Sequence, residues 1–594
     1  MIEFTLAGWD WVVIALYLVF IMGIGQVFKN INSDASDFFR GGGNILWWIA
    51  GMSAIVASIS AWSFTAAAAK VYQTGFLLPG IWWIAGAIAV PVLWFIAPRF
   101  RQMRVITSLE AGYKRFGLAS EQMYVYLVMP MSLFWGGVGL NAVAVFFASA
   151  LSIDTNTTII GMTTIVTVMS LFGGQWAVAA SDFVQGLLMF LTVLVVVYFS
   201  VNLPEIGGVS NLHNVLPDRH FDFTVNTRPV VLLLWVAVTL LTLTLISIDL
   251  NGEGFKYLVA KDGKQVRKMV IMMAVIIVII PLKSIMQLPA ICAAVVYPDM
   301  TAVFPDMKVP AEGAFLAMAF KTLPQGMMGL LICGIFAAAM SSMDTAVNRN
   351  AGYFVRNVYL KYLNKDSSGE QQLLVGRIFT VVFGLIIILI AIAFNKLREM
   401  NLFDIFQVLN GMILMPLMIP VILGILYKKT PSWSAWSTVL VGLITGAFAK
   451  MLYSDELALK ILSETAPLNA AEQADIQYIF ITIIVFVVSV IWFFMTSIFY
   501  KKSSPEFIQQ VDVFFEDMAR PIDHDLEDVK HQDGMQYKML GFMCLVFGGF
   551  TLLGMLIPNE LSGRLCFLFV GGVIFVIGLV LFRKYLKLTK DEVS

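Results

Sequence analysis

Residues 337–345 read Ala-Ala-Ala-Met-Ser-Ser-Met-Asp-Thr and lie near the end of a long apolar run. In a helix Ser341 stacks on Asp344 and Ser342 stacks on Thr345, because residues three apart share one face. An ionisable group at bilayer depth costs about 2.5–3.5 kcal/mol on insertion scales, so it usually has a function or a partner. The stretch is therefore a candidate ion site. The alternative is a carboxylate at the cytoplasmic end of the helix, solvated or paired with a nearby arginine, and it stays open at this point.

The composition is that of a membrane protein. The 594-residue chain is 59% hydrophobic and 13% charged, with a mean hydropathy of +0.83. Long apolar runs with few charges are typical of membrane helices and not of soluble domains. The formal net charge is zero, so nothing indicates a nucleic-acid partner. All four cysteines lie in apolar runs and are expected to be small core residues, not disulfides or metal ligands.

The apolar runs predict an all-α polytopic membrane protein with about fifteen spans. These lie near residues 9–28, 46–70, 76–97, 122–151, 157–173, 176–201, 229–250, 268–297, 325–348, 375–395, 402–427, 433–452, 477–500, 538–557 and 564–584. No basic region precedes the first run, so we expect a retained span and not a cleaved signal.

Lysine and arginine residues set the expected orientation. They gather in alternate loops, at residues 99–115, 256–268, 428–429 and 583–587. The positive-inside rule then places these loops, including Lys256, and the C-terminus in the cytoplasm and the N-terminus outside. We expect a multi-pass protein of the plasma (inner) membrane. In the inside loop 501–537, Ser-Pro-Glu at 504–506 predicts a helix start, and the amphipathic residues 507–518 are expected at the membrane surface or on the cytoplasmic face.

No motif for catalysis is present. All four histidines lie in predicted loops, and the chain contains no HExxH, G-x-S-x-G, CxxC or P-loop pattern. A carrier, a channel or a membrane sensor remains. A sensor usually has a sizeable signalling domain, and a channel often needs an oligomer to line its pore. Fifteen spans in one chain favour a monomeric carrier, and the missing motifs argue against an enzyme.

Two predicted spans look breakable, and carriers often bind ions where helices are broken. Residues 54–63 read Ala-Ile-Val-Ala-Ser-Ile-Ser-Ala-Trp-Ser, and residues 239–254 combine threonines and serine with Asp249, Asn251 and two glycines. Small residues also allow close helix packing, so for each span alone both interpretations stay open. Breaks in two spans that lie five apart nevertheless suggest inverted repeats.

Three stretches resemble the sodium/solute symporter family, which includes the sodium/glucose cotransporters. They are Asp-Phe-Phe-Arg-Gly-Gly at 37–42 with Trp-Trp at 47–48; Gly-Gly-Gln-Trp-Ala-Val at 173–178, followed by Ser181, Asp182 and Gln185; and the opening stretch with residues 323–329 and 357–359 around it. The resemblance extends from about residue 9 to residue 500. It implies a five-plus-five inverted-repeat, leucine-transporter-like core with additional helices.

That core divides the chain into four parts. They are residues 1–45, an extra helix and loop; 46–201, the first repeat; 229–427, the second repeat; and 428–594, extra helices with the cytoplasmic loop 501–537. The resemblance also implies the family's sodium site between the first and eighth core helices. Its ligands would be the backbone carbonyls of Val56, Ile59 and Ala338 and the hydroxyls of Ser341 and Ser342. Neutral oxygens suit a weakly held monovalent cation, whereas a calcium site normally recruits several carboxylates.

Some family members have a second sodium site, which would correspond here to Asp182, Ser341, Asp344 and Thr345. Asp344 departs from the family pattern, because members with this site usually carry a hydroxyl there. Two carboxylates close together repel unless a cation or proton lies between them. We therefore hypothesise a second cation or proton site in addition to the first sodium ion. The alternative is that Asp182 serves gating or helix packing and that Asp344 pairs with a lysine or arginine.

The substrate is less clear. Sugar-carrying relatives hold hydroxyls with acidic and amide side chains, and the matching positions here are Trp62, Ser63 and Trp82. Asn251, Gln287 and Gln407 could add polar contacts, and Lys283 could meet a substrate carboxylate or pair with an aspartate. Tryptophan and serine can still stack on a sugar and bond to it, and an aromatic pocket also suits a quaternary ammonium.

The sequence thus predicts a sodium-coupled symporter that imports a small organic solute, with a sugar or sugar-like polyol favoured. A symporter for an organic acid or a quaternary amine is an alternative. So is a transceptor or sensor that binds solute at the same site without net flux. The expected partners are the solute and the lipid bilayer.

Overall fold

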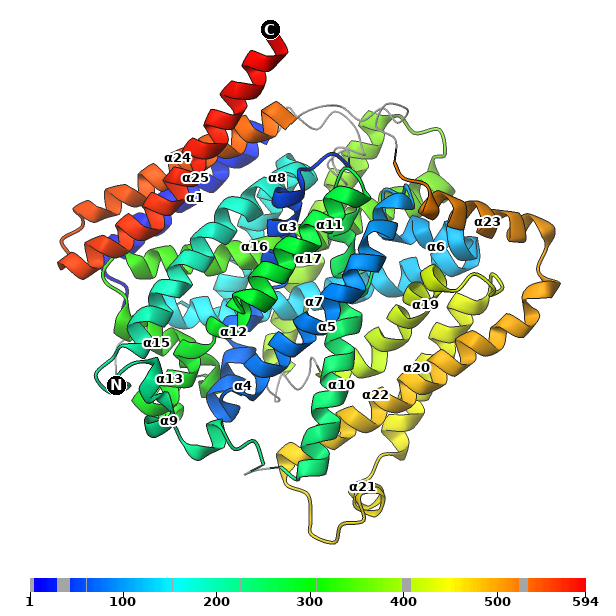
Figure 1. Cartoon of the computed structure of the whole chain (residues 1–594), viewed down its shortest axis with the longest axis horizontal. Coiled ribbons are helices and arrows are strands. Elements are labelled where there is room, and N and C mark those ends of the chain that lie inside the picture. The colour runs from blue at the N-terminus through cyan, green and yellow to red at the C-terminus, as the bar shows by residue number, and fades with distance from the viewer. Residues whose placement is uncertain are drawn as a thin grey trace.

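A computed structural model shows a bundle of tilted helices (Figure 1). It describes residues 5–28, 43–59, 61–151, 153–224, 227–305, 307–397, 407–522 and 533–593, and it leaves out some side chains inside helices, among them 172–177, 344 and 345. Within these ranges twelve helices are long and apolar enough to cross a membrane, and one bent helix pair makes a thirteenth. The all-α membrane architecture is confirmed.

The long helices follow the predicted spans closely. They are α5 (Leu77–Gln102), α7 (Leu118–Leu151), α8 (Thr155–Val201), α10 (Pro229–Ile248), α16 (Met327–Phe354), α17 (Gly369–Leu397), α19 (Met415–Leu426), α20 (Ser434–Leu452), α22 (Ala470–Met495), α24 (Asp533–Leu553) and α25 (Leu561–Val593). A further span, Gly263–Val296, consists of α11 (Gly263–Met273), η6 (Ala274–Ile279), α12 (Leu282–Ile285) and α13 (Leu288–Val296). The N-terminal α1 (Gly8–Phe28) has a shorter apolar part, Gly8–Ile21.

The count of fifteen spans stays a prediction. The spans expected at 157–173 and 176–201 correspond to the single helix α8. At 1.5 Å per residue its 47 residues extend over about 70 Å. This is more than twice the thickness of a bilayer's hydrocarbon core, which is about 30 Å. The one helix therefore has the length of the two predicted spans together.

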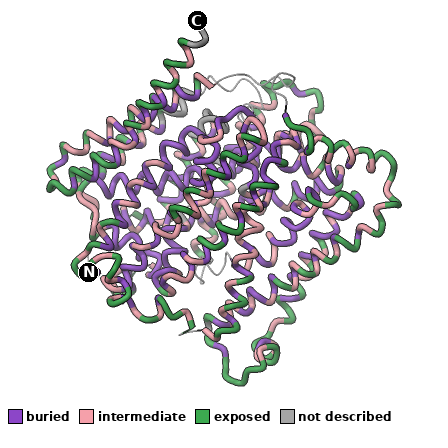
Figure 2. The backbone as a smooth tube through the Cα atoms, viewed as in Figure 1, coloured by how far each residue is buried: buried purple, intermediate pink, exposed green. Residues whose placement is uncertain are grey.

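Helix α16 lies at the centre of the bundle. It contacts α1, α7, α8 and α17, and 94% of its apolar window is buried. A helix that is hydrophobic all round is expected to be buried in this way. In Figure 2 the buried residues gather in the middle of the molecule, while α1, α24 and α25 lie at one edge and α20 and α22 at the opposite edge (Figure 1).

Both predicted helix breaks are confirmed. Helix α3 (Trp47–Ala57) is followed by η2 (Ala61–Phe64) and α4 (Ala66–Thr74), and the pair bends by 47°. Helix α10 ends at Ile248, and irregular backbone leads to η5 (Glu253–Tyr257). The second break needs a glycine, because a Cβ on Gly254 would lie 2.7 Å from the Asp249 carbonyl oxygen. That oxygen accepts a hydrogen bond from the Gly254 N–H at 2.8 Å.

The near ends of the two broken segments are joined. Ile45, just before α3, pairs with Ala260, just after η5, in an isolated parallel bridge. Arg101 Nε of α5 donates to the Ala260 carbonyl oxygen at 2.6 Å. The Gln536 side-chain amide of α24 donates to the Asn44 carbonyl at 2.8 Å. Its oxygen accepts a hydrogen bond from the N–H of the residue after Ile45 at 3.0 Å. We call Arg101, Gln536 and the bridge the end clamp.

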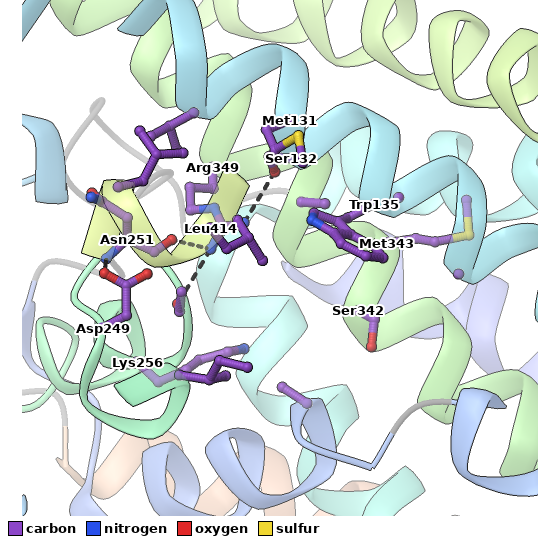
Figure 3. A pocket seen from close by; sticks show the side chains of 18 of the residues that line it. Met131, Ser132, Trp135, Asp249, Asn251, Lys256, Ser342, Met343, Arg349 and Leu414 are labelled. Carbon is purple, nitrogen blue, oxygen red and sulfur yellow. Dashed lines mark hydrogen bonds between the residues drawn. The ribbon is translucent and has the colours of Figure 1, made fainter. Parts of the chain in front are cut away.

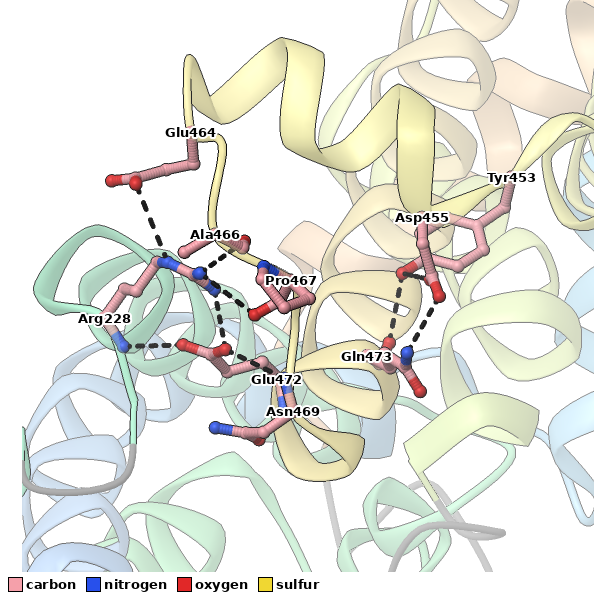
Figure 4. A network of polar contacts seen from close by, with 9 residues as sticks. All are labelled: Arg228, Tyr453, Asp455, Glu464, Ala466, Pro467, Asn469, Glu472 and Gln473. Atoms are coloured by element: carbon pink, nitrogen blue, oxygen red, sulfur yellow. Dashed lines mark hydrogen bonds and ion pairs between the residues drawn. The ribbon is translucent and has the colours of Figure 1, made fainter.

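Capping residues fix where two other helices begin. Asp10 of α1 accepts the N–H groups of Gly326 and Gly329, each at 2.8 Å, and so caps α16 from another helix. At the start of α10, Arg228 binds Glu472 through its side chain at 2.7 Å and its backbone N–H at 2.9 Å (Figure 4). Glu472 also completes a capping box with Asn469 at the start of α22.

The predicted amphipathic helix of the 501–537 loop is confirmed as α23 (Pro505–Ala519), with Ser504 as its N-cap. It packs on the short helix α6 (Ser108–Phe116). Gln510 Nε2 donates to the carbonyls of Tyr113 and Lys114 at 2.8 and 2.9 Å. All four cysteines are buried and free, as expected.

A buried histidine gives a pH prediction. His220 is fully buried, its Nε2 donates to the Tyr72 carbonyl at 3.0 Å, and its own carbonyl accepts from the Phe76 N–H at 3.2 Å. Burial lowers the pKa of His220, the bond to Tyr72 raises it, and the charge of Arg219 lowers it, so that the pKa lies below 6.5. The unfolded chain therefore binds a proton at this histidine more readily than the folded chain does. The stability that neutral His220 contributes is complete above pH 6.5 and is lost as the pH falls through the folded-state pKa.

We expect the wild type to lose more thermal stability than His220→Gln between pH 7.5 and pH 5.5. Melting temperatures in detergent at the two pH values measure this. An equal loss in both proteins would contradict the prediction.

Candidate functional site

One cavity of about 320 Å³ lies where the two broken segments meet the bundle (Figure 3). It is bordered by α3, α7, α16, α19 and the irregular backbone around η5. Most of its wall is apolar, with Trp135 and Leu140 of α7 and Met343 of α16. Its polar lining side chains are Ser132, Asp249, Asn251, Lys256, Ser342 and Arg349. A mostly apolar pocket with a few converging polar groups is typical of a small-molecule site, and this volume lies at the small end of that range.

Arg349 holds three elements together across the cavity. Its Nη1 donates to the carbonyls of Asn251 and Gly252 at 2.8 and 3.3 Å, and its Nη2 donates to Ser132 Oγ at 3.1 Å. The broken segment thus gives its unpaired carbonyls to a side chain of α16, as buried backbone groups require. In Figure 3 Arg349 lies between Asn251 and Ser132. The alternative that Arg349 pairs with Asp344 is not tested, because the side chain of Asp344 lies outside the described residues.

Lys256 stands in a loop that the positive-inside rule places in the cytoplasm, but its side chain is not solvated. The residue is 3% exposed, and its Nζ lies 3.4 Å from Asp182 Oδ2 in α8. It also donates to Ser53 Oγ of α3 at 2.9 Å, and Ser53 in turn donates to Asp182. The reason is chemical: a buried carboxylate needs a counter-ion, and the chain supplies one from η5.

The expected sodium ligands occupy two facing elements. Val56 lies in the last turn of α3 and Ile59 follows the helix, both buried. Ala338, Ser341 and Ser342 lie in α16, which contacts α3. Ser342 lines the cavity together with Ala54 and Ala57 of α3. Ser342 Oγ donates to the Ala338 carbonyl at 3.2 Å. The buried Ser341 hydroxyl has no hydrogen-bond partner within the described part of the chain.

The residues of the expected second cation site are only partly described. Asp182 is fully buried, and its Oδ2 binds Lys256 and Ser53, as given above. Its Oδ1 has no hydrogen-bond partner among the described residues. The side chains of Asp344 and Thr345 lie outside the described residues, so this site stays a hypothesis.

The expected substrate residues separate into groups. Trp62 and Trp82 have ring centroids 6.2 Å apart, and Gln287 Nε2 donates to the Ser63 carbonyl at 3.2 Å. None of these four lines the cavity, and neither does the buried Gln407. Asn251 does line it. Its Oδ1 has no hydrogen-bond partner among the described residues.

Lys283 adjoins the tryptophan group. Its Nζ lies 4.8 Å from the centre of the Trp82 ring, an attractive cation–π geometry. It also donates to the Ser58 carbonyl at 3.3 Å, at the first break. Lys283 is therefore held by the first broken helix and the face of Trp82.

Several cavity residues were not predicted as site residues. Asp249 stood in the breakable stretch 239–254, so its signal was present but was not weighed as a substrate contact. Ser132 and Trp135 lie in a long apolar helix, where a serine and a tryptophan carry no specific signal. Their role depends on which face of α7 meets the cavity.

A membrane protein with two interrupted helices bordering one small-molecule cavity has the architecture of a secondary carrier. The chain belongs to the sodium:solute symporter family, whose profile matches residues 38–442. It is a sodium-coupled solute symporter and a multi-pass membrane protein, and its relatives are transporters and not enzymes.

Three relatives illustrate the range of the family. The sodium/glucose cotransporter of Vibrio parahaemolyticus is 25% identical, over 76% of this chain and 87% of its own. The sodium/sialic acid symporter NanT of Aliivibrio fischeri is 26% identical, over 73% of this chain and 86% of its own. The sodium/myo-inositol cotransporter 2 of Bos taurus is 24% identical, over 86% of this chain and 79% of its own.

A solved structure has the same fold. It is a substrate-bound, outward-open Na⁺-coupled sialic acid symporter, with a TM-score of 0.67 and 22% identity. The match covers 84% of this chain and 98% of that one.

Proposed function

We propose that this symporter imports a small, neutral, polyhydroxylated solute, a sugar or sugar-like polyol, together with sodium by alternating access. One observation carries the proposal. A single cavity has on its wall both Ser342, an expected sodium ligand, and the Asp249–Asn251 break of the second interrupted helix. An ion and a solute bound there would contact the same helices. Binding of one would then change the affinity for the other, which couples the ion to the solute.

Sodium is proposed to bind the carbonyls of Val56, Ile59 and Ala338 and the hydroxyls of Ser341 and Ser342. The residues fit a hard cation, because all five ligands are oxygens and none is charged. The Ser341 hydroxyl, which has no hydrogen-bond partner among the described residues, supports the site, since a buried polar group without a partner is costly. Bound sodium would tie α3 to α16. Solute would then bind, one helix group would rock against the other, and sodium would leave where it is scarce.

The electrostatics of the cavity favour a neutral solute. The two cationic groups among its described lining residues already have partners, since Lys256 binds Asp182 and Arg349 binds two carbonyls and Ser132. The Asp249 carboxylate and the Asn251 amide oxygen are acceptors for solute hydroxyls, and Trp135 offers a ring face. The glucose and myo-inositol cotransporters among the relatives support this class, while the sialic acid symporters keep an organic acid as the alternative.

The wider organisation is part of the same proposal. The two inverted repeats are residues 46–201 and 229–427, flanked by residues 1–45 and 428–594. We keep fifteen spans, an N-terminus outside and a C-terminus inside the cytoplasm, a monomer as the functional unit, and one sodium ion as the minimum, with no nucleic-acid partner.

Uptake into proteoliposomes tests the solute class. We expect an inward sodium gradient, but not a potassium gradient, to drive accumulation of labelled glucose or myo-inositol in preference to N-acetylneuraminate or glycine betaine. Sodium-dependent uptake of either of the last two instead would overturn the neutral-solute proposal. Binding without accumulation would identify the sensor alternative.

Asp249→Asn tests the contact with solute. The substitution keeps the shape but removes the charge, and a hydrogen bond to a charged group is worth about 1.5–3 kcal/mol. We expect KM for the solute to rise roughly tenfold or more, while the sodium affinity measured without solute stays the same. Asp455→Asn is the control, because Asp455 is an exposed carboxylate at the start of α21 (Asp455–Leu462) that binds Tyr453 and Gln473 (Figure 4). An unchanged KM in Asp249→Asn would remove this residue from the solute site.

A further inference from the structure

The pair of Asp182 and Lys256 lies next to the expected sodium site but has a different chemistry. Asp182 is fully buried and Lys256 is 3% exposed. The ammonium nitrogen lies 3.4 Å from the carboxylate and 2.9 Å from Ser53 Oγ, and Ser53 donates to the same carboxylate oxygen. Asp182 lies in α8, Lys256 in η5 and Ser53 in α3. The cluster therefore connects both broken segments to the long helix α8.

Among the described residues of this cluster, one carboxylate faces one ammonium group. A buried carboxylate requires one positive charge, which a bound metal ion or a protein cation can supply. Here Lys256 supplies it and also uses the Ser53 hydroxyl as an acceptor. A sodium ion bound between the same groups would add a second positive charge to a pair that is already neutral.

The position of the ammonium also matters. Lys256 lines the cavity, whereas Asp182 does not. In Figure 3 the Lys256 side chain lies extended below Asp249 and Asn251, along one wall of the cavity. An ion that entered through the cavity would therefore meet the ammonium group before the carboxylate, and like charges repel.

We propose that the Lys256 ammonium is a tethered counter-ion that takes the place of a second sodium ion at Asp182, so that each transport cycle uses one sodium ion. The inference rests on the proposed sodium site at α3 and α16. It makes Lys256 the residue that determines the ion stoichiometry of this symporter. A lysine on the chain cannot be released, so its charge moves with η5 and does not draw on the sodium gradient.

Counting bound sodium tests the inference without any solute. We expect the purified wild-type chain to bind one ²²Na⁺ per molecule at saturation. Lys256→Met should bind two, because it leaves the Asp182 carboxylate and the Ser53 hydroxyl open to an ion. Lys321→Met is the control, since it removes a lysine from an exposed ion pair with Glu205, and it should bind one.

A second variant covers the case in which Lys256→Met does not fold with its carboxylate unpaired. The double variant Asp182→Asn with Lys256→Met removes both charges and should fold and bind one sodium ion. Two sodium ions in the wild type, or one in a folded Lys256→Met protein, would overturn the inference and leave the proposed function intact. A double variant that also fails to fold would overturn it too. No sodium in the wild type would overturn the proposed sodium site and the inference with it.

Discussion

Replacing Ser341 by alanine is expected to remove most of the stabilisation of the protein by sodium while leaving the sodium-free protein as stable as the wild type. The Ser341 hydroxyl is buried and has no hydrogen-bond partner among the described residues. Its removal therefore breaks no bond within the described part of the chain and relieves the desolvation cost of an unpaired polar group. If sodium is its partner, the loss of one ligand to a charged centre costs about 1.5–3 kcal/mol, which is about a 10- to 100-fold loss of sodium affinity.

Melting temperatures in sodium and in potassium measure this effect. Ligand that binds the folded state alone raises stability with its concentration, so the wild type should melt higher in sodium. Ser341→Ala should lose most of that shift, and Ser342→Ala should lose part of it. Thr380→Val is the control, because its hydroxyl is buried in α17 and bound to the Gly376 carbonyl at 3.0 Å. It should lower both melting temperatures and keep their difference. A full sodium shift in Ser341→Ala would remove the residue from the sodium site.

Arg115→Met is expected to give the largest loss of stability among single substitutions outside the cavity. Arg115 of α6 is 2% exposed and binds the end of α19. It donates to the carbonyls of Gly424, Tyr427 and Lys428 at 2.9, 3.0 and 3.0 Å and to Thr430 Oγ1 at 2.7 Å. The last carbonyls of a helix have no intrahelical partner. Methionine would leave the Gly424 and Tyr427 carbonyls and Thr430 Oγ1 without this donor, whereas the Lys428 carbonyl keeps the Thr430 N–H at 3.0 Å.

Each orphaned buried acceptor costs about 1 kcal/mol or more, so the total is roughly 3 kcal/mol or more. Arg115→Lys should recover little of this, because an ammonium group lacks the planar five-donor fork of the guanidinium. Arg520→Met is the matched control, because Arg520 is an exposed arginine with an Asp517 partner three residues away. The yield and melting temperature of purified protein measure both. A melting temperature of Arg115→Met within two degrees of the control would contradict the prediction.

The two helix breaks and the start of α23 could be predicted from the sequence because their signals are local. Hydroxyl and small residues at 54–63 and Asp249, Asn251 and the glycines at 249–254 mark the two breaks, and Ser504 marks the start of α23. These signals depend on the residue's own neighbours along the chain. The family motifs then supplied the expected pairing of α3 with α16, which local periodicity cannot give.

The sequence could not reveal how charges pair across the bundle. Lys256 and Asp182 are 74 positions apart. The positive-inside rule counts lysines in loops, so it placed Lys256 in a cytoplasmic loop without regard to its burial. Burial of a lysine depends on a carboxylate brought from another helix, so it appears when tertiary contacts are known. The same holds for Arg349, whose partners are backbone carbonyls that exist because the second helix is broken. The expected substrate residues do not all line the cavity, because their positions also depend on tertiary contacts. Gln287, for example, binds the Ser63 carbonyl and does not reach the cavity.

The end clamp has a consequence for the resting rate of ion leakage. Four hydrogen bonds hold the near ends of the broken segments: one from Ile45 to Val259, one from Arg101 and two at Gln536. At about 1 kcal/mol net each, releasing these ends from each other and from α5 and α24 costs about 4 kcal/mol, so roughly one molecule in a thousand would have them released without ligand. Gln536 lies beyond the region that the family profile matches. The C-terminal helices of this chain would thus act as a latch that limits uncoupled slippage and protects the sodium gradient of an idle cell.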